Sequence, residues 1–333
     1  MRQVPTVRAA ALTGFAALSR SYGLDGRAIL RACGITGDAE QEPDRRLPTS
    51  AVNQAFERAA ELAGIEDFGL RLSELRGFSN LGPVTLLARD EPDIRSALSI
   101  FTAYLPLHNE ALTIDLAEHD DVAILSCTLA GEGPRVQAVD VAVAMLHRIL
   151  RQLLGPGWTP LAIYLERPRP VRAGQFERVF GAPVHYAQDF SGIVLARVDL
   201  DQSNQLAEAA LRPYAEQLRA TLPGLGDLPM VERVRRLLRA MLAGRRCTAS
   251  LAAEHLGISR RTLERRLAEE GVTFHALLDE VRTDLARGQL TGSRRSNAEI
   301  AELLGFSSSA AFTAWFTNLH DLPPQAWRRR QRT

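Results

Sequence analysis

The fold of the C-terminal third is decided by Leu251-Ala-Ala-Glu-His-Leu-Gly-Ile-Ser259 and the Arg-Arg-Thr-Leu-Glu-Arg-Arg-Leu267 that follows it. A second version reads Ile300-Ala-Glu-Leu-Leu-Gly-Phe-Ser307, followed by Ser-Ser-Ala-Ala-Phe-Thr-Ala-Trp-Phe316. Each version is a short apolar helix, a glycine, a serine that can cap the next helix, and an amphipathic second helix. This order is typical of a helix-turn-helix, whose second helix enters the major groove of DNA. The duplication predicts a transcription regulator that reads two consecutive stretches of groove.

The outward face of the first recognition helix is predicted to make the main DNA contacts. Arg261 and Arg265 are four residues apart and share one helix face, so both can reach guanine O6 and N7. Arg260 and Arg266 lie to the sides of that face and are expected to contact phosphates. Their position directly after the turn favours DNA contact over a merely solvated arginine-rich face.

The second recognition helix is predicted to be the weaker reader because its outward face carries no charge. Its expected base contacts are Ser309, Ala310 and Thr313, and its expected phosphate contacts are Ser308 and Thr317. These side chains offer hydroxyl and methyl groups but no bidentate arginine. We therefore expect the first unit to supply most of the specificity and affinity.

Serine caps and a connecting helix are expected to organise the two units. Ser259 and Ser307 are predicted to cap the recognition helices, which leaves one more residue between cap and core in the second unit. Ser296-Asn-Ala-Glu299 is predicted to form a capping box. The joining helix is expected over Phe274 to Leu290, and about 17 residues span about 25 Å. Since a turn of B-DNA is about 34 Å, we expect the DNA to bend when both helices bind.

The charge of the chain is divided between its two ends. The net charge of the 333 residues is +1, but residues 230–333 hold 18 arginines against 11 acidic residues, which is +7. The remainder therefore carries −6. A basic C-terminal part behind an acidic N-terminal part suits DNA binding at one end.

Cysteine use and hydropathy favour a reducing compartment and no membrane span. Cys33, Cys127 and Cys247 are far apart and odd in number, and they match no disulfide framework and no metal spacing. No run approaches the roughly 18 apolar residues of a membrane span, and Ala9 to Leu18 is predicted to be a first helix rather than a signal peptide. We expect a cytoplasmic protein without a cofactor or a metal.

Residues 1–200 are predicted to form an α+β ligand-sensing domain. Apolar spacings of three and four predict early helices, over Val7–Ser21, Gly26–Cys33, Ser50–Ala63 and Asp93–Leu105. A hairpin around His119-Asp-Asp121, a long helix over Pro134–Leu154 and further short strands predict a mostly antiparallel sheet with helices on it. Residues 229–333 are predicted to be an all-α DNA-binding domain.

Residues 201–228 are predicted to be a helix and a linker, and the helix is the candidate dimerisation element. The helix is expected over Asp201 to Thr221, and the linker is the Pro- and Gly-rich stretch that ends at Pro229. An apolar stripe at four-residue spacing consists of Leu206, Ala210, Tyr214 and Leu218. The stripe can pair with a second copy or pack on its own domain. A homodimer would place two DNA-binding domains on a repeated site.

The C-terminal part resembles the AraC family of bacterial transcription regulators, in which seven helices form two helix-turn-helix units. The match covers about residues 229 to 330. Its residues are Ser259 to Leu267, Gly271-Val-Thr-Phe274, Arg282, Leu285-Ala286, Ile300 to Ser307, Ala311-Phe312, Phe316, Pro324 and Trp327-Arg328.

The resemblance also implies which residues contact bases. In the first recognition helix the family's positions fall on Arg261 and Arg265, and in the second they fall on Ser309, Ala310 and Ala314. The chain departs from the family at Ala314, Thr317-Asn318 and Asp321, where the family has arginine, basic residues and glycine. These departures favour weak DNA contact by the second unit.

The N-terminal part resembles the effector domain of the ornithine- and arginine-regulator branch of that family, and not the sugar-binding cupin of its founding member. The residues are Ala32-Cys-Gly-Ile35, Arg46-Leu-Pro48, Phe68-Gly-Leu-Arg-Leu72, Gly82-Pro83, Pro160 to Pro168 and Phe180-Gly-Ala-Pro-Val184. The resemblance implies a small-molecule sensor. The branch varies widely in its ligands.

An effector pocket is expected between the first helices, the Gly82-Pro83 turn and the sheet. Its candidate residues are Phe78, Tyr104, His108 and His147. Few charges in this set suggest an apolar or aromatic ligand. Packing in the core is the alternative role for each residue.

Two other classes of function stay open beside a ligand-controlled regulator. An enzyme would have to use His108, His119, His147 or His185, but no metal-ligand spacing, phosphate loop or nucleophile elbow accompanies them. An architectural DNA-binding protein without an effector leaves the N-terminal domain unexplained. We expect double-stranded DNA, a small-molecule effector and a second copy as partners, with RNA polymerase as a further candidate.

Overall fold

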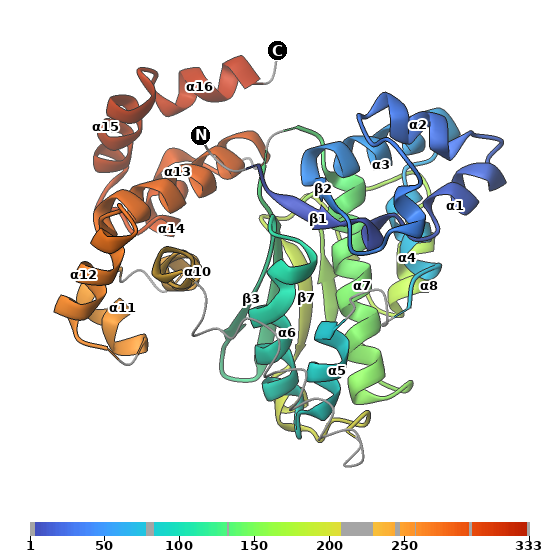
Figure 1. Ribbon diagram of the computed structural model, residues 1–333, viewed down its shortest axis with the longest axis horizontal. Helices are drawn as coiled ribbons and strands as arrows, with labels where there is room; N and C mark the ends of the chain where they lie inside the picture. Colours follow the sequence, from blue (N-terminus) through green and yellow to red (C-terminus); the bar gives the residue numbers. More distant parts are fainter. Residues whose placement is uncertain are drawn as a thin grey trace. The chain divides into compact units, whose positions relative to one another are not determined.

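The computed structural model describes residues 4–77, 83–131, 133–207, 229–243, 247–256, 258–292 and 295–331. The chain divides into two compact units, unit 1 over Met1–Thr221 and unit 2 over Leu222–Thr333 (Figure 1). Within the described ranges, no helix combines the length and the hydropathy that a membrane crossing needs.

Unit 1 begins with a helical layer. Its elements are β1 (Thr6–Arg8), the 3-10 helix η1 (Ala9–Leu12), α1 (Phe15–Ser21), α2 (Gly26–Ala32), the 3-10 helix η2 (Ala39–Gln41), β2 (Arg46–Pro48), α3 (Thr49–Ala63) and α4 (Phe68–Glu74). The apolar faces of these helices share one core, in which the Phe15 ring lies 5.8 Å from that of Phe56 and 5.7 Å from that of Phe68. Aromatic rings at this distance pack edge to face or tilted, and they bury much of the apolar surface of the layer.

The helix predicted over Val7 to Ser21 is wrong in its first half. Thr6–Arg8 is instead a strand that pairs antiparallel with Arg46–Pro48. Gly14 has a φ of +83°, which interrupts the chain just before α1. The apolar spacing in the sequence could not show this, because the strand partner lies about forty residues further on.

A five-stranded sheet forms the second layer of unit 1. It follows α5 (Pro83–Asp90) and α6 (Ile94–His108) and consists of β3 (Leu112–Glu118), β4 (Val122–Leu129), β5 (Ala162–Tyr164), β6 (Val184–His185) and β7 (Ser191–Ala196). The spatial order is β3-β4-β7-β5-β6. Only the β5–β6 pairing in this sheet is parallel. The predicted hairpin and the mostly antiparallel sheet are confirmed.

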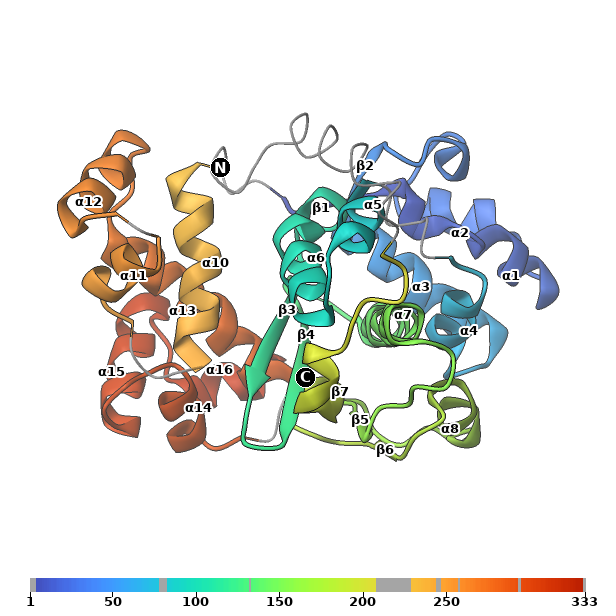
Figure 2. The same cartoon turned by 90° about the horizontal axis from the view of Figure 1, so that it is seen from below.

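Two long helices pack on one face of this sheet. Helix α7 (Val136–Leu154) contacts β4 and β7, and α6 contacts β3 and lies beside α7 (Figure 2). Strand β4 shows why, because Ala123, Leu125 and Cys127 are buried on that face while the residues between them are less buried. Helix α8 (Gly174–Phe180) and the 3-10 helix η4 (Arg197–Asp201) complete the α+β fold.

A close approach joins the helical layer to α7. Gly69 of α4 donates its N–H to Gln137 Oε1 at 2.8 Å. A Cβ at this position would lie 2.1 Å from the Gln137 carbonyl oxygen, so any other residue would push α4 away. The glycine of the Phe68-Gly-Leu-Arg-Leu72 segment therefore has a packing role.

The helix predicted from Asp201 onward is wrong in its first residues. Asp201 ends η4, and Ser203 bridges to Asp93. The Asn204 side-chain amide donates to the Glu91 carbonyl at 2.8 Å, which fixes this connection beside the α5–α6 turn. Local apolar spacing could not reveal these long-range bonds.

Unit 2 is all-helical in its described residues, as predicted. Its helices are α10 (Met230–Ala243), α11 (Ala249–His255), α12 (Arg260–Glu269), α13 (Phe274–Gly292), α14 (Asn297–Leu303), α15 (Ser309–His320) and α16 (Pro324–Gln331). They form two cores, one around Leu263 and Leu267 and the other around Phe312 and Phe316. Helix α13 contributes to both cores and holds the two helix-turn-helix units together (Figure 1).

Candidate nucleic-acid interface and ligand cavity

The first recognition helix is α12, and Ser259 caps it as predicted. The Ser259 hydroxyl oxygen accepts the Thr262 N–H at 3.1 Å, which satisfies one of the free amides at the helix start. Leu263 and Leu267 are fully buried on the inner face. This packing leaves the arginines of α12 on the exposed face.

The four arginines of α12 differ in their partners. Arg260 pairs with Glu264 at 2.8 Å, and Arg265 pairs with Glu269 at 2.5 Å, in both cases one turn along the helix. Arg261 and Arg266 are exposed and have no carboxylate partner in the described part of the chain. Exposed pairs of this kind contribute about 0.3–0.5 kcal/mol, so DNA can displace the glutamates at little cost.

The cap of the second recognition helix is Ser308, and the prediction of Ser307 was wrong. The Ser308 hydroxyl oxygen accepts the Ala311 N–H at 3.1 Å, and α15 begins at Ser309. The spacing from the cap to the first buried core residue is then four residues in both recognition helices, from Ser259 to Leu263 and from Ser308 to Phe312. The extra residue belongs to the turn, and the run of three serines concealed this in the sequence.

The outward face of α15 is small and uncharged. Ala310 is exposed, and Ser309 and Thr313 are partly exposed, as base-contacting positions must be. The Thr317 hydroxyl donates to the Thr313 carbonyl at 2.7 Å, so this hydroxyl proton is not free for a phosphate. Ser308 uses its oxygen as a cap and keeps its hydroxyl proton.

Polar contacts fix α15 and α14 to α13. The Trp315 indole N–H donates to Asp279 Oδ1 at 3.0 Å. The Arg282 Nε–H donates to the Leu304 carbonyl at 3.0 Å, and its guanidinium carbon lies 4.5 Å from the centre of the Phe306 ring. Sequence reasoning named Arg282 only through the family resemblance and missed Asp279. Within unit 2, these contacts set the position of the second helix-turn-helix relative to the first.

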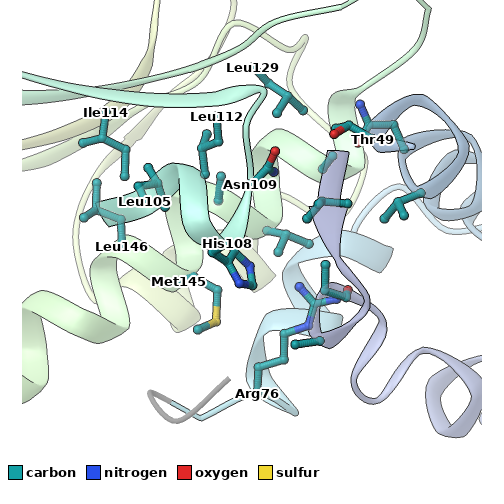
Figure 3. Close-up of a pocket in the computed structure, with 18 of the residues that line it drawn as sticks. Thr49, Arg76, Leu105, His108, Asn109, Leu112, Ile114, Leu129, Met145 and Leu146 are labelled. Atoms are coloured by element: carbon teal, nitrogen blue, oxygen red, sulfur yellow. The ribbon is translucent and has the colours of Figure 1, made fainter. Parts of the chain in front are cut away.

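Unit 1 holds a cavity of about 80 Å³ between its two layers (Figure 3). A single water needs roughly 10–15 Å³, so the cavity has room for several waters or a small organic molecule. Its walls come from η1, α3, α6, β3, β4 and α7. Most of the lining side chains are apolar, including Val52, Leu105, Ile114, Met145 and Ile149.

One of the four predicted effector residues lines this cavity. His108, at the end of α6, projects into it (Figure 3). Tyr104 is buried one turn earlier and does not line the cavity, and Phe78 lies outside the described residues. His147 does not line it either, since its ring packs against Phe180 at 5.3 Å.

Sequence reasoning missed four polar side chains of the lining, Arg76, Thr49, Asn53 and Asn109. Arg76 is only 5% exposed, and burial lowers its pKa to about 9. It donates to the carbonyl oxygens of Ala11 and Thr13, the latter at 3.2 Å. The Thr49 hydroxyl has no hydrogen-bond partner among the described residues. An isolated arginine after a short helix gives no signal in the sequence that it is buried.

His108 is uncharged at neutral pH. Burial, together with the positive charges of Arg8, Arg76 and Arg46, lowers its pKa to about 3. Its Nδ1 atom is buried without a hydrogen-bond partner in the described structure. A neutral imidazole can supply one donor and one acceptor to a bound molecule.

The histidines considered for an enzyme are not brought together. His119 is exposed in the β3–β4 turn, and the His185 ring in β6 lies 5.0 Å from that of Tyr164. His108 and His147 lie on different helices, α6 and α7. Among the described residues, no cluster of three or more His, Cys, Asp or Glu side chains could bind a metal ion.

Most of the predicted dimerisation stripe lies outside the described residues. Ala210, Tyr214 and Leu218 fall there. Leu206 is described, and its N–H donates to Asn204 Oδ1 at 3.0 Å. This bond belongs to the connection after η4, and the stripe stays a prediction.

Comparison with known proteins gives two matches to family models. Residues 23–204 match the model described as the arabinose-binding domain of AraC transcription regulator, N-terminal. Residues 252–330 match a helix-turn-helix domain. The first match contains most of the cavity lining, and the second contains both recognition helices.

Several regulators are similar over almost the whole chain. The HTH-type transcriptional regulator VirS of Mycobacterium tuberculosis is 27% identical, over 97% of this chain and 96% of that protein. The ornithine utilization regulator of Pseudomonas aeruginosa is 28% identical, over 94% of this chain and 92% of that protein. The crystal structure of transcriptional regulator CdpR from Pseudomonas aeruginosa aligns with a TM-score of 0.44 and 21% identity, over 94% of this chain and 97% of that chain.

Proposed function

This chain belongs to the AraC family of transcription regulators, and from that premise we propose that a small apolar molecule bound in unit 1 controls sequence-specific DNA binding by unit 2. The observation that carries the proposal is the apolar cavity within unit 1. Most of its lining falls in residues 23–204, which match the family's N-terminal domain. The helix-turn-helix domain of a transcription regulator implies DNA binding.

The lining of the cavity favours an apolar ligand over a sugar. A sugar carries hydroxyl groups on every side, and each buried hydroxyl needs a hydrogen-bond partner. The polar side chains of the lining are few, namely Thr49, Asn53, Arg76, His108 and Asn109. The arabinose in the name of the family model and the ornithine in the name of a relative are therefore poor guides to this ligand.

We propose that α12 leads the reading of DNA. Arg261 and Arg265 are the base-contacting arginines, and Arg260 and Arg266 contact phosphates. Helix α15 adds weaker contacts through Ser309, Ala310 and Thr313 and, at a phosphate, through Ser308. The phosphate contact predicted for Thr317 would require its hydroxyl to leave the Thr313 carbonyl. The exposed arginines of α12 and the uncharged face of α15 support this division.

Control by the ligand is proposed to act on the relative placement of DNA-binding domains. We place the sensing domain in residues 1–200, the connecting segment in 201–228 and the DNA-binding domain in 229–333. The stripe that begins at Leu206 would pair two copies, so the ligand would shift the populations of dimer states that bind a repeated site differently. RNA polymerase is the proposed downstream partner.

Selection of duplexes from random DNA by the full chain tests the proposal. We expect enrichment of a defined sequence, with at least tenfold preference over random duplex. Arg261→Ala should reduce that preference about 5- to 150-fold, since a bidentate arginine–guanine contact contributes about 1–3 kcal/mol. Arg172→Ala, an exposed arginine of unit 1, removes the same charge and should change nothing.

The same experiment separates the alternative functions. Binding without any enriched sequence would support an architectural DNA-binding protein. An enriched site whose affinity ignores every apolar molecule tried would contradict ligand control. Absence of DNA binding by a folded chain would overturn the regulator.

A further inference from the structure

We propose that the cavity of unit 1 binds an apolar monocarboxylate, and that the carboxylate of this ligand pairs with Arg76. The inference rests on the proposed sensing function of unit 1 and adds the chemical class of the ligand. It starts from a charge that the folded chain leaves uncompensated.

Three arginines lie within electrostatic reach of His108, and two of them have carboxylate partners. Arg8 pairs with Asp44, and Arg46 pairs with Glu110 at 2.9 Å. Arg76 is the third, and no carboxylate of the described residues pairs with it. Residues 78–82, which follow it and are not described, contain no acidic side chain. A buried cation without a counter-ion is costly for a folded protein.

The bonds that Arg76 makes leave part of its guanidinium unused. Two N–H groups donate to the carbonyls of Ala11 and Thr13, and the guanidinium carbon lies 5.5 Å from the centre of the Phe56 ring. The remaining N–H groups have no acceptor among the described residues. The planar guanidinium matches a carboxylate, which accepts two parallel hydrogen bonds.

The rest of the cavity selects the remainder of the ligand. Figure 3 shows Arg76 and His108 at one side of the cavity and Leu112 and Ile114 at the other. A ligand with its carboxylate at Arg76 would therefore extend a hydrocarbon part between α6, α7 and β3. The neutral His108 ring can add one hydrogen bond to the carboxylate.

The charge count of the lining limits the ligand to a single negative charge. Arg76 is the only charged side chain among the described residues that line the cavity. The buried His108 stays neutral and adds no second charge. A dicarboxylate or a phosphate ester would bring a negative charge without a partner into an apolar cavity.

Matched ligands test the proposal on the full chain. Propanoate, butanoate and pentanoate, chosen to suit a cavity of about 80 Å³, are compared with the alcohols and amines of the same length by calorimetric titration at neutral pH. We expect at least one carboxylate to bind at least tenfold more tightly than its alcohol and its amine. Equal binding of acid and alcohol, or binding of none of the acids, would overturn the inference.

Two variants at Arg76 and a control at another arginine assign the preference to one side chain. Arg76→Gln should lose the preference for the acid over the alcohol, and Arg76→Lys, which keeps the charge, should retain part of it. Arg46→Gln removes an arginine that already has Glu110 as its partner, and the preference should persist. An acid preference that survives in Arg76→Gln would contradict the proposal. If Arg76→Gln does not fold, the acid preference of Arg76→Lys is compared with that of Arg46→Gln. A smaller preference in Arg76→Lys supports the proposal, and equal preferences contradict it.

Failure of this inference and failure of the proposed function give different results. If no carboxylate binds but the chain still enriches a DNA sequence, the ligand class is wrong and the regulator stands. If butanoate binds with the expected preference but the chain binds no DNA, the ligand class is supported and the proposed regulator is wrong.

Discussion

Asp321 shows how one residue departs from its family for a conformational reason. It ends helix α15 with a φ of +54°, in the left-handed region that favours glycine, and its N–H donates to the Thr317 carbonyl at 2.9 Å. The family resemblance gave glycine at this position and suggested a link to weak DNA contact. In the structure the position caps a helix end, so the departure concerns stability.

Replacement of Asp321 by glycine should stabilise unit 2 by about 0.5 kcal/mol. Glycine relieves a left-handed strain of about 1 kcal/mol and removes a negative charge from a helix C-terminus. The larger backbone entropy of glycine in the unfolded chain offsets part of this gain. Thermal unfolding of the full chain measures it as a higher Tm for the unit 2 transition. DNA affinity should be unchanged, and a lower Tm would contradict the explanation.

Two buried histidines should make unit 1 sensitive to acid. Burial lowers the pKa of His108 to about 3 and that of His147 to about 4. Below about pH 6.5 the unfolded chain binds protons at these positions and the folded chain does not, so stability is present above that pH and lost on acidification. For each histidine, the free energy of unfolding should fall by about 2 kcal/mol when the pH is lowered from 7 to 5.

Urea denaturation at the two pH values measures this loss. His147→Leu should flatten the pH dependence by about half, because it removes one of the two buried histidines. His119→Ala, which removes an exposed histidine of the β3–β4 turn, should leave the dependence as it is. A His147→Leu variant that loses as much stability as the parent would show that His147 is protonated in the folded chain.

At the scale of elements, the two recognition helices share a design and differ in charge. Both have a serine cap four residues before the first buried core residue. Helix α12 then exposes four arginines, whereas the outward face of α15 has none. The difference in DNA affinity between the two recognition helices should therefore depend on their side chains and not on their placement.

Introducing arginine at Ala314 should strengthen DNA binding by α15. Ala314 is exposed on the outward face, and an arginine there adds a contact to a base or a phosphate. We expect a three- to tenfold higher affinity, with a salt dependence steeper by about 0.9 if the contact is to a phosphate. Leu319→Arg adds the same charge on another side of α15, where 48% of the leucine is exposed, and should have a smaller effect. Equal effects of the two variants would mean that α15 does not face DNA.

Local patterns in the sequence were sufficient for elements whose bonds are local. The helices of unit 2, the capping box at Ser296 and the β3–β4 hairpin all depend on neighbours within a few residues, and all three are confirmed. The strand at Thr6–Arg8 and the connection at 201–207 were missed because their partners lie far along the chain.

The candidate site also contains residues that local sequence predicts and residues whose environment depends on distant parts of the chain. The arginines of α12 could be placed on an exposed face from helical spacing alone, and the structure leaves them exposed. His108 was named for the pocket and lines the cavity, but Arg76 was not named. Arg76 packs against η1 and against Phe56 of α3, and no local pattern encodes that arrangement.

At the scale of the whole molecule, each unit has its own core and its own candidate site. Unit 1 holds an apolar cavity with one buried cation, and unit 2 presents two recognition helices joined by α13. For a ligand in unit 1 to control DNA binding by unit 2, it need only bind two arrangements of the chain with different affinity. The central claim is that unit 2 reads DNA mainly through α12.

A hydroxyl-radical footprint on the enriched DNA site tests that claim most directly, with wild type and Arg261→Ala compared at low and physiological salt. We predict two protected segments on one face of the DNA, about 10 base pairs apart, and loss of both in Arg261→Ala at physiological salt. Both are lost because α15 alone contributes too little affinity. Protection that persists unchanged in Arg261→Ala would contradict the account.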